Sequence, residues 1–253
     1  MRKRTPSFAL ILILKIMKTI EQLKQEIGRT ITAFEVGGFR PLNTIEESWI
    51  ARVTAYKEEE GIPLDDQGRE MIPLLQLYLP NLPFVPKALE GIVLLTVFMS
   101  YDYPEQLEPM GNKWVIRTYD SLEGVVQKEL TNKDSILHPF PLKPRLEQVD
   151  YPIWDGGGLT IEQEDRICEM EDEGVMESYY DVFDAHCYDT KLGGYPSYCQ
   201  PGIGVDEEYG EGYEFVFQIS TNEKVNLNVV DNGSFMFAYN KQSKGWSIYY
   251  DFY

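Results

Sequence analysis

The chain has 253 residues, of which 43% are hydrophobic and 25% charged, an ordinary composition for a globular protein with a large core. Its 41 acidic and 23 basic residues give a formal net charge of -18, which argues against nucleic-acid binding because that function needs basic patches facing phosphates. Cys168, Cys187 and Cys199 are too scattered for a disulfide framework, and with His186 they match no paired zinc knuckle. We therefore expect a cytoplasmic protein with reduced thiols, no metal and no cofactor.

Residues 1–18 are interpreted as a dispensable or mis-called N-terminal extension. A basic start precedes the apolar run Phe8–Leu14, which is far shorter than the ~20 residues of a membrane-spanning helix. No small-residue cleavage site follows it, and Met17 is an alternative start directly before an amphipathic pattern. We expect residues 19–253 to form one domain without a membrane anchor.

The first half begins with a predicted helix and continues as strands. An apolar stripe predicts a helix over residues 19–35, which Gly37 and Gly38 end; its members are Ile20, Leu23, Ile27, Ile31 and Phe34. Strands are expected at 49–53, 73–79, 91–99 and 114–119, with a polar loop at 58–69. The continuous apolar run 91–99 predicts a strand buried on both faces.

The connection between the halves, residues 132–158, is rich in proline and glycine and is predicted as a linker with a strand near 145–149. Thr160 and Gln163 form a capping-box pattern that predicts a helix to about Gly174, and a shorter helix is expected at 177–183. Strands then return, so the fold class is α+β: mainly antiparallel sheets from two duplicated β-units with a few appended helices.

An internal repeat is the main organising feature of the sequence. The distance from Gln76 to Gly91 is 15 residues, and the distance from Gln218 to Gly233 is the same. Each copy ends on a tryptophan-led alternating run, at 114–119 and 246–250. The pattern predicts similar β-units at about 60–120 and 190–253, with Gln76 equivalent to Gln218 and Gly91 equivalent to Gly233.

The loop Lys191-Leu-Gly-Gly-Tyr-Pro carries the main site candidates. Paired glycines before Tyr195-Pro196 indicate a tight turn with positive φ, and alternatively a loop whose bare backbone approaches a ligand. A glutamine inside an apolar strand must be hydrogen-bonded, to a neighbouring loop or to a ligand. The candidate ligand-binding residues are Lys191, Gly193, Gly194, Pro196, Gln218, Asp231 and Gly233.

No catalytic residue is assigned. His186 beside Cys187 suggests a nucleophile pair, but adjacent side chains in an extended strand point to opposite faces. Asp231 opens a turn before a strand, and no second acid stands at a telling spacing from it.

Acidic residues are concentrated in two places. Residues 155–190 carry twelve acids with Arg166 as their only basic residue. A second acidic run lies in the longer insert of the second unit, where Asp206, Glu207, Glu208 and Glu211 are the candidate partner-binding residues. Such runs are usually solvated faces, and alternatively they form a surface for a basic partner.

These motifs together resemble those of the YwqG family of uncharacterised bacterial proteins. The resemblance rests on Lys191-Leu-Gly-Gly-Tyr-Pro, Phe215-Val-Phe-Gln-Ile and Asp231-Asn-Gly-Ser-Phe-Met-Phe, with a second block at Leu75-Gln76-Leu77 and Gly91-Ile-Val-Leu-Leu. It covers roughly residues 37–253. It implies the fold and no established enzymatic activity, and relatives of this kind are sometimes found beside toxin genes.

Two functions from different classes follow. The first is a non-catalytic binding protein with an acidic surface, in its sharpest form an immunity protein that caps a basic toxin. The second is an enzyme or small-ligand binder that uses a cleft between the two repeats. A neighbouring gene for a secreted toxin would favour the first, and a metabolic operon the second.

Overall fold

The computed structural model describes residues 19–102, 113–154, 156, 158–198 and 212–251. Ten strands in this part of the chain form one sheet, and β3 pairs with β7 separately. Each of these pairings is antiparallel, so the fold is α+β and mainly antiparallel, as the sequence predicted.

The elements of the first half are β1 (Arg29–Val36), β2 (Trp49–Ile50), β3 (Ala55–Lys57), β4 (Ile72–Tyr78), η1 (Leu79–Asn81), η2 (Lys87–Leu89), β5 (Leu94–Met99), β6 (Trp114–Tyr119), β7 (Val125–Gln127) and β8 (Phe140–Asp150). Those of the second half are α2 (Ile161–Asp172), η3 (Tyr179–Asp181), β9 (Lys191–Gly193), β10 (Glu214–Ser220), η4 (Glu223–Val225), β11 (Ser234–Asn240) and β12 (Gly245–Asp251). A helix over residues 19–27 precedes β1.

The sheet has a symmetric strand order about its central pair. The order is β12-β11-β10-β9-β1-β8-β2-β4-β5-β6, so β1 and β8 each begin a run of four further strands. Gln76 lies opposite Trp49 in one run, and Gln218 lies opposite Lys191 in the other. A register shift precedes both glutamines, between Pro73 and Leu75 and between Phe215 and Phe217.

The outer strands correspond as well, with one exception. Trp114 faces Met99 and Trp246 faces Tyr239, which are matching positions when the two glutamines are aligned. The predicted equivalence of Gly91 and Gly233 is wrong. Gly233 directly precedes β11, whereas two residues separate Gly91 from β5.

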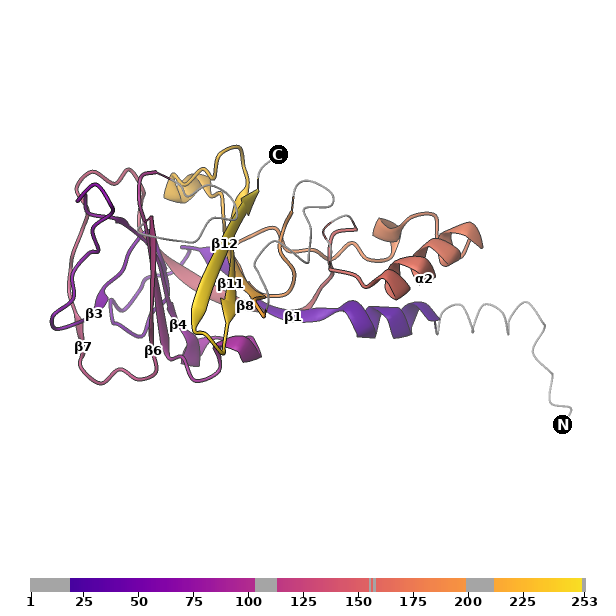
Figure 1. Ribbon diagram of the computed structural model, residues 1–253, viewed down its shortest axis with the longest axis horizontal. Helices are drawn as coiled ribbons and strands as arrows, with labels where there is room; N and C mark the ends of the chain where they lie inside the picture. The colour runs from indigo at the N-terminus through magenta and orange to yellow at the C-terminus, as the bar shows by residue number, and fades with distance from the viewer. Residues whose placement is uncertain (1–18, 103–112, 155, 157, 199–211, 252–253) are drawn as a thin grey trace, which may run out of the picture.

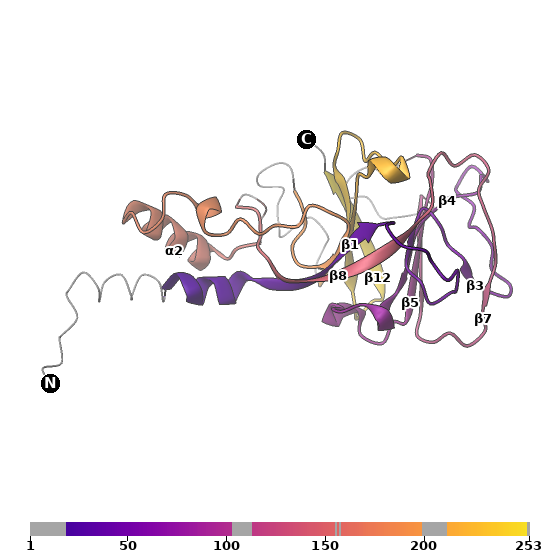
Figure 2. The same cartoon turned by 180° about the vertical axis from the view of Figure 1, so that it is seen from behind.

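The two runs of strands share one hydrophobic core. The Trp114 ring of β6 contacts the rings of Phe235 and Phe237 on β11, at centroid distances of 4.8 and 5.7 Å. The sheet therefore curls so that its last strand, β6, lies across the core from β11 near the other end of the strand order (Figures 1 and 2). All residues of β5 are buried, as the apolar run predicted.

A helical lobe projects from one end of the sheet. We call residues 19–27 together with 153–184 the acidic lobe; its two helices lie side by side in Figure 1. Leu23 and Ile27 pack against Ile167 and Met170 of α2 in a hydrophobic cluster of their own. The predicted capping box is present, with Thr160 accepting from the Gln163 backbone and Gln163 accepting from the Thr160 backbone.

Three predictions about elements are wrong. The helix expected at 19–35 ends before Gly28, and residues 29–36 form β1 because β8 and β9 hydrogen-bond to both of its edges. By contrast, the strand expected near 145–149 is confirmed as part of the longer central strand β8, which also contains Pro141 and Pro144 of the proline-rich segment. The helix expected at 177–183 is only the short turn η3, and the strand expected at 49–53 ends at Ile50 because Ala51 has a φ of 58°.

Candidate functional site

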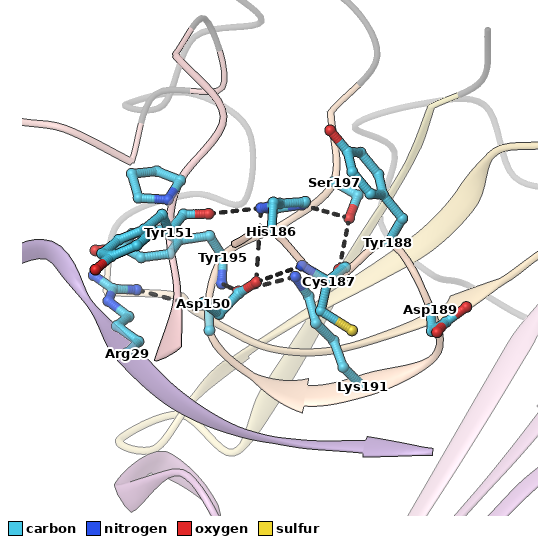
Figure 3. A network of polar contacts seen from close by, with 12 residues as sticks. Arg29, Asp150, Tyr151, His186, Cys187, Tyr188, Asp189, Lys191, Tyr195 and Ser197 are labelled. Atoms are coloured by element: carbon cyan, nitrogen blue, oxygen red, sulfur yellow. Dashed lines mark hydrogen bonds and ion pairs between the residues drawn. The ribbon is translucent and has the colours of Figure 1, made fainter. Parts of the chain in front are cut away.

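A buried carboxylate stands behind the Gly193-Gly194 loop. Asp150, the last residue of β8, is fully buried and accepts three hydrogen bonds. They come from Lys191 Nζ at 3.0 Å, the Tyr195 amide at 2.8 Å and the Cys187 amide at 2.7 Å (Figure 3). Burial lowers the pKa of Lys191, and the neighbouring Asp150 carboxylate opposes that shift. The site is therefore built around a buried ion pair.

The paired glycines allow the loop to wrap this carboxylate. Gly193 and Gly194 have φ values of 84° and 76°, the left-handed region that the sequence predicted for this turn. A β-carbon on Gly194 would collide with Asp150 Oδ2, and one on Gly193 would lie 2.7 Å from the Phe84 ring. The bare backbone thus approaches an internal carboxylate of the same chain.

His186 connects this carboxylate to a serine. Its Nδ1 lies 2.7 Å from the Tyr151 carbonyl oxygen, so Nδ1 carries the proton, and Nε2 accepts from Ser197 Oγ at 2.9 Å. Burial lowers the pKa of His186 to about 4, and the charge of Lys191 adds to the effect. The imidazole is therefore neutral near pH 7, and its 3.7 Å contact with Asp150 Oδ1 is not an ion pair.

Gln218 anchors the loop from the sheet side. Its Oε1 accepts from the Ser197 amide at 3.2 Å. Its Nε2 lies within hydrogen-bond distance of four acceptors: the carbonyls of Tyr188 and Asp189 and the hydroxyls of Ser197 and Ser220. The predicted tie between a strand glutamine and a neighbouring loop is thus confirmed.

The network also joins the sheet to the acidic lobe. The Arg29 guanidinium lies over the Tyr195 ring, 3.9 Å from its centroid, and donates to the Gly194 carbonyl at 3.2 Å. Tyr195 Oη donates to the carbonyl of Ile27, at the end of the first helix. Changes at this site can therefore reach the lobe through direct contacts.

The structure brings together only some of the predicted ligand residues. Lys191, Gly193, Gly194 and Gln218 belong to the network, and Pro196 follows in the same loop. Asp231 and Gly233 lie elsewhere, in the turn before β11, where the Gly233 carbonyl accepts from the Thr221 amide. The acidic residues of the 206–211 run lie outside the described residues.

Sequence reasoning missed the residues that complete the site. Asp150 and Ser197 stand 41 residues before and 6 after Lys191, and no local pattern marks either one as its partner. His186 and Cys187 do point in different directions, as predicted, with the imidazole toward Ser197 and the sulfur away from it (Figure 3). Burial raises the pKa of the Cys187 thiol, which keeps it in its unreactive protonated form.

Two features are absent from the described part of the chain. There, no three His, Cys, Asp or Glu side chains gather as they would around a metal ion. Among the same residues, no helix is long and apolar enough to cross a membrane. The chain matches no family model and no curated protein with which it was compared.

Proposed function

We propose that the main role of the protein is to bind a basic partner through the acidic lobe, a role that involves no catalysis. Residues 161–184 carry ten acids with Arg166 as their only basic residue, and Arg166 is already paired with Glu26 at 2.7 Å. The exposed face of α2 presents Glu162, Asp165, Glu169 and Asp172. Such a face raises the rate at which an oppositely charged partner associates.

The acids of the middle and last turns of α2 lower the stability of the helix, which supports a role other than folding. The last turn of α2 carries Glu171 and Asp172 and no basic residue. Negative charge there opposes the helix dipole, and Asp165 and Glu169 repel each other at a spacing of four residues. Residues that destabilise their own helix are better explained by what they bind.

Matched charge variants test the proposal. The lobe variant carries Glu162→Gln, Asp165→Asn, Glu169→Gln and Asp172→Asn. The control variant changes four exposed acids of the sheet body: Glu58→Gln, Glu59→Gln, Asp120→Asn and Glu123→Gln. Each of the two variants removes four negative charges, so their net charges are equal. The probe is a fluorescent lysine-rich peptide, followed by anisotropy at low and high salt.

We expect the lobe variant to bind roughly tenfold more weakly at low salt, and the control variant to bind as the wild type does. High salt should abolish the difference because it screens exposed charges. Equal weakening in both variants would mean that only net charge matters, and the lobe proposal would be wrong. If the protein is an immunity protein, its natural partner is a basic toxin. Co-purification with a toxin domain encoded by a neighbouring gene would test this.

The duplication is part of this proposal. Equivalent glutamines, register shifts and tryptophans support descent of the two runs of strands from one β-unit. The charged network then belongs to one copy, because Trp49 takes in the first run the position that Lys191 takes in the second. A difference of this kind is expected where one copy of a repeated scaffold acquires a new role.

A small-ligand function is the second candidate, and one cavity favours it. A cavity of about 350 Å³ lies between the halves, lined by Ile72 and Met99 from one and by Leu227 from the other. Its lining is mostly apolar, as in small-molecule sites. Leu227→Trp should fill it and abolish binding of an apolar dye, whereas equal dye binding by both proteins would exclude this site.

A further inference from the structure

The contacts around His186 are those of an activated hydroxyl. Nucleophile and base lie within hydrogen-bond reach of each other, and a third group orients the base. Here Ser197 Oγ lies 2.9 Å from His186 Nε2, and the Tyr151 carbonyl holds Nδ1 at 2.7 Å. Asp150 Oδ1, 3.7 Å from Nδ1, would stabilise the imidazolium that forms when the base takes a proton.

From this geometry we propose that Ser197 is a nucleophile that forms a covalent bond with small electrophilic esters, with His186 as its general base. The proposal is independent of the acidic lobe, so either can fail alone. A structural hydroxyl needs only a hydrogen-bond partner, and Gln218 already supplies one at 2.9 Å. The additional contact with a correctly protonated imidazole is what nucleophilic chemistry requires.

Ser220 shows the difference within the same network. Its hydroxyl also contacts Gln218 Nε2, at 3.2 Å, and donates to the Tyr188 carbonyl at 2.7 Å. It is buried like Ser197, and its contacts are to carbonyl, amide and hydroxyl groups. Ser220 is therefore the matched control for reactivity that depends on His186.

Access to the pair is through the surface beside His186. A groove of about 470 Å³ is lined by His186, Cys187 and Tyr188, among others. The Tyr188 ring lies against the His186 ring at a centroid distance of 4.6 Å and is half exposed. Ser197 itself is only 4% exposed, and His186 is the member of the pair that lines this groove, so we infer that movement of the Tyr188 ring admits a reagent.

The chemical step is acyl or phosphonyl transfer. Ser197 Oγ attacks the carbonyl carbon or the phosphorus, and its proton passes to His186 Nε2. With an ester, the alcohol leaves with that proton, and water then hydrolyses the acyl-serine through the same base. With a fluorophosphonate, fluoride leaves and the phosphonyl-serine stays intact, so the product can be detected by mass spectrometry.

The experiment labels the full chain with a fluorophosphonate and reads the product by intact mass and peptide mapping. We expect one adduct, on Ser197, that is lost in Ser197→Ala and kept in Ser220→Ala. His186→Gln should slow labelling on the order of 100-fold. Tyr188→Ala should speed it. The proposal is overturned by an unlabelled wild type, by an adduct on another residue, by equal labelling of His186→Gln, or by unchanged labelling of Tyr188→Ala.

A pH profile of the wild type gives a readout that needs no variant. The charged groups facing His186 are Asp150 and Lys191, and burial lowers its pKa to about 4. The imidazole is therefore unprotonated across neutral pH. The labelling rate should stay constant between about pH 6 and pH 8 and should fall as the pH is lowered towards the pKa of His186. A rate that rises steadily with pH would indicate an unassisted serine and overturn the proposal.

Discussion

Gln76 and Gln218 make the same contacts in the two halves of the sheet. Each Nε2 donates to a carbonyl two residues before the strand that pairs with its own; this is the Glu47 carbonyl before β2 for Gln76 and the Asp189 carbonyl before β9 for Gln218. Each Oε1 accepts from backbone amides that follow that strand in the chain; the donors are Thr54 and Ala55, the first residue of β3, in the first half and Ser197 in the second. One buried amide thus fastens two loops in each half.

The equivalence predicts equal effects of substitution. Gln76→Leu and Gln218→Leu should each lower the free energy of unfolding by about 3 kcal/mol, because each leaves buried backbone groups without partners. Gln242→Leu, at an exposed position, should change it by less than about 0.5 kcal/mol. Urea unfolding followed by circular dichroism measures all three. A large loss in only one half would contradict the equivalence.

The wrapping of Asp150 predicts a large loss of stability when Gly194 gains a side chain. Gly194→Ala should destabilise by more than about 4 kcal/mol, since the new methyl group meets the buried carboxylate. Gly38→Ala is the control: Gly38 has a φ of 83°, and a β-carbon there meets nothing within 4 Å. Gly38→Ala should lower the free energy of unfolding only by the strain of the left-handed backbone, about 1 kcal/mol. Similar melting temperatures for both variants would contradict this account of the motif.

The buried ion pair predicts strong coupling. Asp150→Asn alone should cost about 3–5 kcal/mol because it leaves the Lys191 charge buried without its partner. The double variant Asp150→Asn with Lys191→Met should be less destabilised than the sum of the two single variants. Additive losses in chemical unfolding would show that the pair is not coupled.

Features set by nearby residues could be predicted from the sequence, whereas contacts between residues far apart in the chain could not. Thr160 and Gln163 marked the start of α2 because a capping box is formed within four residues. The same reasoning failed for residues 29–35, where the apolar stripe fits a helix but β8 and β9 lie on both sides. Asp150 could not be assigned to the Lys191 loop because only the folded sheet brings them together.

The low pKa of His186 predicts a loss of stability in acid. The unfolded chain protonates this histidine near its ordinary pKa of 6.5 and the folded chain only near 4, so stability falls as the pH drops from about 6.5 towards 4. The full effect is about 3 kcal/mol. His186→Gln should remove most of this slope, whereas His138→Gln, at an exposed residue, should keep it. Equal slopes in wild type and His186→Gln would contradict the assignment.

The most direct test of the binding account asks where a basic ligand sits. Amide hydrogen exchange is measured on the full chain with and without the lysine-rich peptide, at low salt. The account predicts slower exchange within residues 161–184, which carry the exposed acids of α2, and none of this protection in the lobe variant. Protection confined to the sheet body, or the same protection in the lobe variant, would contradict it.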